Sequence, residues 1–235
     1  MRRIALLSLL ALLAAPLSAG AVARPASAPV VVELFTAQGC SDCREANQLV
    51  TRLAEQQDVI ALTYAVDYWD YLGWKDTFAK PEFAERQRAY RRAMNLRDVY
   101  TPQIVVDGAR QLTAVEADEV EAAVREEARK DVYPPDMQFM GGRRVAVGSG
   151  RPPRGGATVW LVRYDDHVQE VTVRRGENRG QVVRQDNVVR ELTRLGEWRG
   201  RPRVYRMPSA GAADLKTVVI VQADRTGRIV AARRL

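Results

Sequence analysis

The chain has 235 residues, long enough for one large hydrophobic core or for two small ones. Its formal net charge at pH 7 is +7, from 36 basic and 29 acidic residues, and the basic residues mostly alternate with acidic ones. This pattern lacks the basic block of a nucleic-acid-binding protein, so we expect a solvated, mildly basic surface.

The N-terminus is typical of a secretory signal peptide covering residues 1–23. Two arginines precede an apolar run at residues 4–17, and Ala21-Val22-Ala23 offers a cleavage site after either alanine, of which we favour Ala23. The apolar run is too short to span a bilayer, and no later stretch is apolar enough to do so. We therefore expect an exported protein, periplasmic or secreted, whose mature chain begins with a disordered leader at residues 24–29 and has no membrane span.

The chain has two cysteines, Cys40 and Cys43, which follow a predicted buried strand at residues 30–35. A glycine-containing turn precedes Cys40, and residues 44–57 carry apolar side chains at helical spacing. Cysteines three positions apart on one helical turn can bring their sulfurs together. The pattern permits a redox-active dithiol, a static disulfide or part of a metal site, and we favour the first.

The predicted helix start distinguishes the two sulfurs. Partial positive charge and unpaired N–H groups at a helix N-terminus stabilise a thiolate and lower the pKa of a cysteine. We therefore expect Cys40 to be the nucleophile and Cys43 the resolving thiol. In an oxidising compartment the pair rests as a Cys40–Cys43 disulfide, so a reducing or isomerising activity needs an external redox partner.

We expect no metal and no cofactor. Zinc usually takes four ligands, and the single histidine, His167, lies far from the cysteines beside Asp165-Asp166 in a predicted turn. Two thiolates suit Cu(I), but no cluster of methionine or histidine accompanies them.

The stretch at residues 67–76 follows a second predicted strand, at residues 59–66, and holds four aromatic residues and three aspartates. Parallel α/β sheets place binding sites at the carboxyl ends of their strands, so Tyr68, Trp69 and Trp74 could form a substrate-binding wall beside Cys40. Equally, the aromatics could plug the loop against the core while Asp70 and Asp76 cap turns. A metal site built from the three aspartates is a remote third alternative.

A basic helix is predicted at residues 81–95, followed by Thr101-Pro102 at the start of another strand. The arginines of this helix are interpreted as a solvated face: Arg86, Arg88, Arg91 and Arg92. A Thr-Pro dipeptide before a buried strand favours a cis peptide bond, and Asp107-Gly108 predicts a hairpin turn. A short strand at residues 109–114 and a charged helix at residues 117–130 complete the unit.

This order of elements resembles the thioredoxin fold, and predicts an α/β thioredoxin-like domain at residues 30–132. The resemblance makes Cys40 the attacking thiol, Cys43 the resolving thiol and Pro102 the cis-proline that faces the disulfide and, with Thr101, positions the substrate. Glu33 lies near the position that, in the thioredoxin fold, holds a buried strand carboxylate, and the resemblance implies that Glu33 assists proton transfer as that carboxylate does. The chain departs from that fold's usual motif at Gly39, where tryptophan is common, and at Ser41-Asp42 between the cysteines.

More narrowly, residues 33–43, 66–74 and 100–103 resemble a secreted bacterial family known as domain of unknown function 1223. The resemblance extends into the second half of the chain. It implies a thioredoxin-like domain with an appended β-rich region and carries no settled activity.

The second half predicts a smaller β-rich domain at residues 137–235, either sandwich-like or barrel-like. A linker is predicted before it, at residues 133–136. Strand-like runs lie at residues 145–147, 157–164, 167–173, 203–205, 218–223 and 228–232. Glu177 and Asn178 lie in a glycine-flanked segment. We interpret it as a turn that hydrogen-bonds its own backbone, with a recognition surface as the alternative.

Two functions are consistent with these features. The first is an exported thiol–disulfide oxidoreductase that acts on protein disulfides through Cys40 and Cys43, with protein or small thiol and disulfide substrates and an unidentified redox partner. The alternative is a non-catalytic binding module on a thioredoxin scaffold, held by a structural disulfide.

Overall fold

A computed structural model describes residues 28–114, 116–130 and 133–235. The predicted signal peptide and all but the last two residues of the predicted leader lie outside the described residues. Among the helices of the described part, none is long and apolar enough to cross a membrane.

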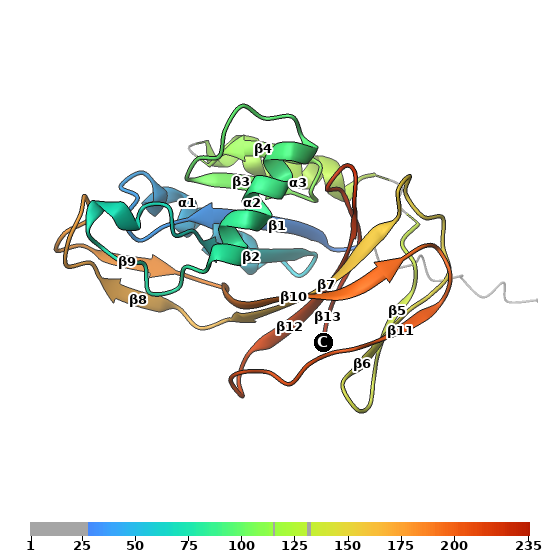
Figure 1. The fold of residues 1–235 in the computed structure, drawn as a ribbon. Coiled ribbons are helices and arrows are strands. Elements are labelled where there is room, and N and C mark those ends of the chain that lie inside the picture. Colours follow the sequence, from blue (N-terminus) through green and yellow to red (C-terminus); the bar gives the residue numbers. More distant parts are fainter. Residues whose placement is uncertain (1–27, 115, 131–132) are drawn as a thin grey trace, which may run out of the picture.

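The central feature is an eight-stranded mixed sheet with the order β13-β12-β7-β10-β2-β1-β3-β4 (Figure 1). Its strands are β1 (Val30–Thr36), β2 (Val59–Ala65), β3 (Gln103–Val106), β4 (Arg110–Thr113), β7 (Ala157–Asp165), β10 (Val188–Trp198), β12 (Lys216–Ala223) and β13 (Ile229–Arg234). The predicted strands at residues 30–35 and 59–66 are confirmed as β1 and β2, which pair in parallel as a strand–helix–strand crossover requires.

Two smaller sheets and the helices complete the fold. A three-stranded sheet has the order β11-β6-β5, and β8 pairs with β9 as a separate hairpin. The remaining elements are α1 (Cys43–Ala54), the 3-10 helix η1 (Asp70–Leu72), α2 (Pro81–Ala93), α3 (Ala117–Ala128), β5 (Met137–Met140), β6 (Arg144–Val147), β8 (Gln169–Thr172), β9 (Val182–Gln185) and β11 (Arg203–Arg206). The three predicted helices are confirmed as α1, α2 and α3, and each ends two or three residues before the predicted end.

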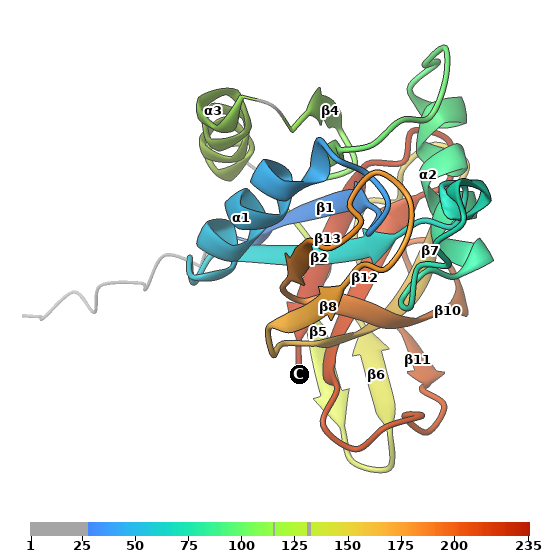
Figure 2. The same cartoon turned by 90° about the vertical axis from the view of Figure 1, so that its left-hand side faces the viewer.

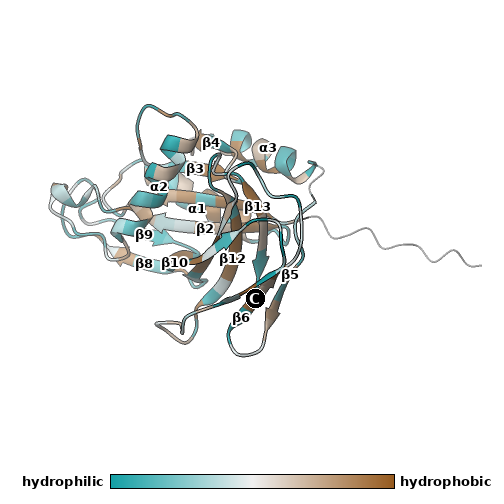
Figure 3. Ribbon diagram, turned by 45° about the vertical axis from the view of Figure 1, so that its right-hand side comes forward, coloured by the Kyte–Doolittle hydropathy of each residue, from teal (hydrophilic) through white to brown (hydrophobic). Residues whose placement is uncertain are grey.

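Helices cover both faces of the sheet, with α1 and α3 on one face and α2 on the other (Figure 2). Alternate residues of β1 point to opposite faces, because side chains along a strand alternate. Val32 and Leu34 pack with α1 and α3, whereas Val31 and Phe35 pack with α2 and with strands of the second half. The buried strands are accordingly mostly hydrophobic, while the outer faces of the helices are hydrophilic (Figure 3).

Strand pairing crosses the predicted boundary at residues 133–136. Val188 of β10 pairs with Thr63 of β2, and the Asn187 side chain donates to the Ala61 carbonyl over 2.9 Å. One sheet therefore runs through both predicted units, and the division into a thioredoxin-like domain and a β-rich domain stays a prediction. β10 itself is absent from the strands that the sequence predicted.

The arginine face predicted for α2 is wrong at Arg86. Its guanidinium is buried and forms an ion pair with Glu33 of β1, with 2.6 Å between Nε and Oε1. The same guanidinium donates to Gln222 of β12 over 3.1 Å, and the hydroxyl of Tyr90 donates to Glu33. This ion pair therefore ties together β1, α2 and a strand from the second half of the chain.

Removing the Arg86 charge should destabilise the protein strongly. Arg86→Met leaves the Glu33 carboxylate buried without its cation, and we expect the free energy of unfolding in urea to fall by about 3–5 kcal/mol. Arg88→Met is the matched control, because Arg88 pairs with Glu85 at the surface of the same helix. This control should change the unfolding free energy by less than about 1 kcal/mol. Equal losses in the two variants would contradict the prediction.

Asp107 should make stability depend on pH. Burial raises the pKa of Asp107 to about 6, and the nearby charge of Glu127 adds to this effect. An unfolded aspartate titrates near pH ~4, so the folded state binds more protons between about pH 4 and 6. The contribution of Asp107 to stability is therefore greatest below pH ~4 and is lost as the pH rises through 6.

Asp107→Asn isolates this effect. The amide oxygen can still accept the hydrogen bond that Val31 N donates over 2.8 Å, and asparagine tolerates the φ of 50° at this position. From pH 4 to pH 7.5 the unfolding free energy of the wild type should fall by about 2–3 kcal/mol relative to the variant. Urea unfolding at a series of pH values measures this difference, and parallel curves would refute the assignment.

Candidate functional site

The two cysteines lie in the turn between β1 and α1. Cys43 is the first residue of α1, and Cys40 lies two residues before the helix N-cap, Asp42. The predicted disulfide is present, with 5.5 Å between the two Cα atoms. Only 3% of Cys40 and 1% of Cys43 is exposed, so a reaction partner has to approach through a defined opening.

The aromatic stretch lies against this turn. The indole N–H of Trp74 donates to Gln38 Oε1 over 2.9 Å, and a Cβ at Gly39 would lie 3.5 Å from the Cβ of Trp69. Tyr68 and Trp69 pack on the core cluster that contains both cysteines. The tryptophans are therefore neighbours of the turn, and the N–H of Trp74 is used in holding it. A substrate-binding role for Tyr68, Trp69 and Trp74 stays a prediction.

The capping roles predicted for Asp70 and Asp76 are confirmed. The Asp76 carboxylate accepts hydrogen bonds from the backbone N–H groups of Gln38, Phe78 and Ala79, and Asp70 accepts one from Asp76 N. Burial raises the pKa of Asp76 despite these hydrogen bonds. Asp76 thus joins the loop at residues 76–79 to the residue two positions before Cys40.

The predicted cis peptide bond joins Thr101 and Pro102. Gln103 is paired with Phe35, which places the buried Pro102 beside the end of β1 and close to the cysteine turn. The indole N–H of Trp69 donates to Thr101 Oγ1 over 2.8 Å. Thr101, Pro102 and Trp69 are therefore brought together at the carboxyl end of β1.

Glu33 has different partners from those expected of a proton-transfer group at the disulfide. Its carboxylate is bonded to Arg86 and Tyr90 on the α2 side of the sheet. Phe35 follows it on the same face and is closer along the strand to the cysteines. The structure assigns Glu33 a buried ion pair, and its role in proton transfer stays a prediction without a contact that supports it.

The segment at residues 173–181, which joins β8 to β9, covers the cysteine turn and was not predicted to do so. The side-chain amide of Asn178 donates to the carbonyls of Gln38 and Cys40, each over 2.9 Å. The hydroxyl of Ser41 donates to Glu177 over 3.0 Å. The segment hydrogen-bonds its own backbone, as the sequence interpretation expects: Gln181 N donates to Asn178 O over 2.9 Å and Gly180 N donates to Val173 O over 2.8 Å. The side chain of Asn178 adds a contact that the sequence did not predict, to a turn 138 residues away.

A glycine provides the backbone conformation of this segment just before Glu177. Gly176 has a φ of 78°, a conformation that side chains disfavour, and it lies against Leu72 and Trp74 of the aromatic stretch. The glycine-flanked Glu177-Asn178 pair was the sequence signal for this contact, but its partner was not readable from the sequence.

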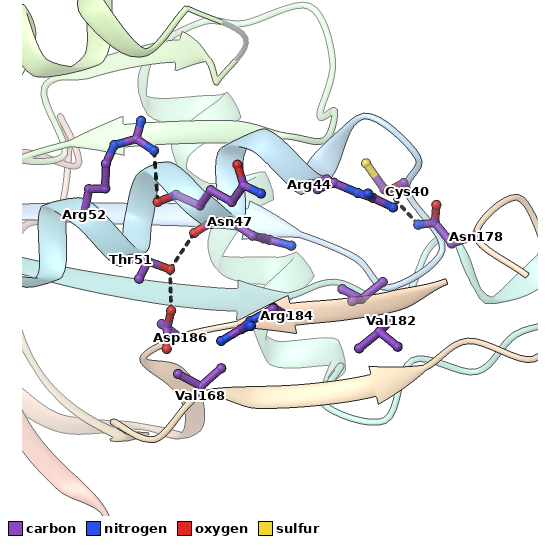
Figure 4. A pocket seen from close by; sticks show the side chains of 12 residues that line it. Cys40, Arg44, Asn47, Thr51, Arg52, Val168, Asn178, Val182, Arg184 and Asp186 are labelled. Carbon is purple, nitrogen blue, oxygen red and sulfur yellow. Dashed lines mark hydrogen bonds between the residues drawn. The ribbon is translucent and has the colours of Figure 1, made fainter. Parts of the chain in front are cut away.

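A cavity of about 500 Å³ lies between α1 and the β8–β9 hairpin (Figure 4). Cys40 and Asn178 lie at one end of it, and Asp186 lies toward the other. Its other lining residues come from α1 and the hairpin: Arg44, Asn47, Gln48, Thr51, Arg52, Val168, Val182, Val183 and Arg184. Cys40 is the cysteine that lines this space, whereas Cys43 does not line it.

His167 lies in an exposed turn. Its Nδ1 is 3.0 Å from Asp165 Oδ1 and 3.7 Å from Asp166 Oδ1, and these groups could together offer ligand atoms to a metal ion. Arg190 and Lys216 already pair with the two carboxylates. The hydrogen-bonded turn agrees with the sequence interpretation.

The family described as "Protein of unknown function (DUF1223)" matches residues 31–222, a range that contains all but the first residue of β1, the cysteine turn, the covering segment and β10. The chain belongs to the DUF1223 family. The family assignment confirms the resemblance inferred from residues 33–43, 66–74 and 100–103.

Two solved structures are similar to this DUF1223 chain. Protein AGR_C_4864 from Agrobacterium tumefaciens is 30% identical, with a TM-score of 0.70 over 88% of this chain and 93% of that chain. HBP35 of Porphyromonas gingivalis is 12% identical, with a TM-score of 0.58 over 89% of this chain and 75% of that chain, which is a likeness of fold alone. Among the curated proteins, none matches.

The Asn178 contact makes a testable prediction about access to the disulfide. Asn178→Ala removes two hydrogen bonds between the covering segment and the turn, at about 1 kcal/mol each. If the segment must open for a reductant to enter, the rate of disulfide reduction by dithiothreitol should rise by about tenfold or more. Arg179→Ala, an exposed change in the same segment, should leave the rate unchanged. Equal rates in all three proteins would show that the segment does not limit access.

Proposed function

We propose that this DUF1223 protein is an exported thiol–disulfide oxidoreductase that acts through Cys40 and Cys43. The observation that carries the proposal is the position of Cys40. Cys40 belongs to a disulfide at the strand-to-helix turn after β1, the cis-proline Pro102 lies beside the end of the same strand, and Cys40 lines a cavity large enough for a ligand.

The arrangement supports distinct roles for the two sulfurs. A substrate thiolate that enters the cavity meets Cys40 first, so Cys40 forms the mixed disulfide. Cys43 leaves as a thiolate at the first residue of α1, where the N-terminal end of the helix stabilises negative charge. In the reverse direction, Cys43 attacks the mixed disulfide and releases the substrate.

A thioredoxin-like core is part of the proposal. Four adjacent strands have the order β2-β1-β3-β4, and β1 and β2 are parallel and joined through α1. The cis-proline directly precedes β3, and α3 follows β4. Export is the other part: the N-terminal sequence pattern supports it, and an oxidising compartment would keep the pair as a disulfide between reactions.

The burial of the cysteines favours a second candidate, a non-catalytic binding module with a structural disulfide. Both sulfurs are almost fully covered, and segments on two sides hydrogen-bond the turn. The reduction potential separates the two functions, since structural disulfides typically lie below about −300 mV. A pair above that value with a reactive Cys40 supports the oxidoreductase.

Activity itself gives the direct test. The wild-type protein should accelerate the reduction of insulin by dithiothreitol, and Cys40→Ser should abolish the acceleration because the attacking sulfur is lost. Cys43→Ser should retain Cys40 and accumulate a mixed disulfide that mass spectrometry detects. The proposal would be overturned if wild type and Cys40→Ser showed the same negligible exchange with insulin and with small disulfides in every redox buffer.

A further inference from the structure

The cavity that Cys40 borders has arginine on two of its walls. Arg44 and Arg52 come from α1, and Arg184 comes from β9 on the opposite wall (Figure 4). Asp186 is the carboxylate among the lining residues, and it already accepts a hydrogen bond from Thr51. The lining thus carries three positive charges and one negative charge.

The arginine nearest in sequence to the disulfide is Arg44, which directly follows Cys43. Its guanidinium donates to the neutral side chain of Gln181 over 3.0 Å and has no ion pair among the described residues. Arg184 pairs with Glu170 over 3.3 Å, but both side chains are more than half exposed, so water screens that pair. The positive charge of the lining is therefore available to a ligand.

Two carboxylates near the cysteine turn carry negative charge that opposes the positive charge of the arginines. Asp42 and Glu177 both contact the hydroxyl of Ser41, over 3.5 and 3.0 Å. Both residues are exposed and neither lines the cavity. An anion on the surface of the turn would meet these carboxylates, whereas an anion inside the cavity meets the arginines.

The other lining groups suit a small organic molecule. Val168 and Val182 lie on the hairpin side of the cavity and Asn47 lies on the α1 side (Figure 4). Val183 and Gln48 also line the cavity, so its lining combines apolar side chains with neutral amides. A cavity of about 500 Å³ lies within the range of small-molecule sites.

We propose that the thiol that exchanges with the Cys40–Cys43 disulfide is a small anionic thiol, bound in the cavity between α1 and the β8–β9 hairpin by Arg44 and Arg184. The inference rests on the proposed oxidoreductase function and names its substrate class. Guanidinium groups recognise carboxylates and sulfonates through charge-assisted hydrogen bonds, and a cationic cleft raises the local concentration of an anion.

The exchange balances without another reactant. The substrate thiolate attacks Cys40 Sγ, a bond forms between the two sulfurs, and the Cys40–Cys43 bond breaks with its electron pair on Cys43 Sγ, which takes a proton from water. A second thiolate attacks the substrate sulfur of the mixed disulfide and releases Cys40 as a thiolate, which takes a second proton from water; the two substrate thiols released two protons to water when they ionised. Two thiols become one disulfide, and the protein gains two electrons and two protons.

Three thiols of similar size test the charge preference: 2-mercaptoethanesulfonate (anionic), 2-mercaptoethanol (neutral) and cysteamine (cationic). The measurement is the second-order rate constant for reduction of the protein disulfide, expressed per thiolate at low ionic strength. Each value is divided by the rate of the same thiol with hydroxyethyl disulfide, which corrects for intrinsic nucleophilicity. The anionic thiol should exceed the cationic one by about tenfold or more.

Variants assign the preference to the cavity. Arg44→Gln and Arg184→Gln should each lower the ratio of the anionic thiol's corrected rate to that of 2-mercaptoethanol about three- to fivefold. Both arginines are exposed, so neither change should unfold the protein. Arg88→Gln, an exposed change on α2, serves as the control and should have no effect. Raising the salt concentration from about 0.01 to 1 M should shrink the preference, because the Debye length falls from about 30 to 3 Å.

The outcomes separate the two proposals. Equal corrected rates for the three thiols, or a preference for cysteamine, would overturn the anionic substrate while leaving the oxidoreductase intact. A preference for the anion that survives both arginine substitutions would overturn the cavity as its source. If none of the three thiols reduced the disulfide under native conditions, the inference would fail, and the insulin assay would decide separately whether the proposed function fails with it.

Discussion

The buried ion pair between Glu33 and Arg86 joins β1 to α2, and its hydrogen bond to Gln222 extends it to the second half of the molecule. Removing both charges from water is costly, and the cost is offset only while the carboxylate keeps the guanidinium and the Tyr90 hydroxyl as partners. Arg86 also bonds Gln222, whose amide in turn reaches Tyr90 and Gly227. Because these partners come from β1, α2 and β12, β1 cannot move relative to α2 without leaving a charge unpaired, and β12 cannot move relative to α2 without breaking the hydrogen bonds of Gln222.

The shared sheet brings the second half to the disulfide. β10 pairs with β2 at Val188, and the hairpin that precedes β10 consequently lies alongside α1 (Figure 2). The segment at residues 173–181 then bonds the cysteine turn through Asn178, while β9 forms one wall of the cavity. The first half supplies the sulfurs, and the second half decides how they are reached. Any selectivity of the disulfide therefore depends on residues more than 130 positions away in the chain.

Local signals predicted much of the first half because each depends on neighbouring residues. The apolar run of β1, the helical spacing of α1 and the turn at Asp107-Gly108 are properties of short segments, and all are present in the structure. The cis bond before Pro102 and the capping by Asp76 were also predicted, since proline and aspartate act on the backbone near them. β10 was missed because register shifts at Val189/Glu191 and Arg194/Gly196 interrupt its alternation.

The sequence by itself determined the cysteine spacing, the strand–helix order around it and the family. Only the tertiary structure decided the partners of its polar residues. In the sequence, Arg86 cannot be distinguished from the other basic residues of its helix. In the fold it lies opposite Glu33, and both side chains are buried, so each charge requires the other as its partner. Asn178 has the sequence context of a turn residue, and only the fold brings its amide to the carbonyls of Gln38 and Cys40. In each case the group that satisfies a buried charge or hydrogen bond is distant in the chain, so its identity depends on the completed fold.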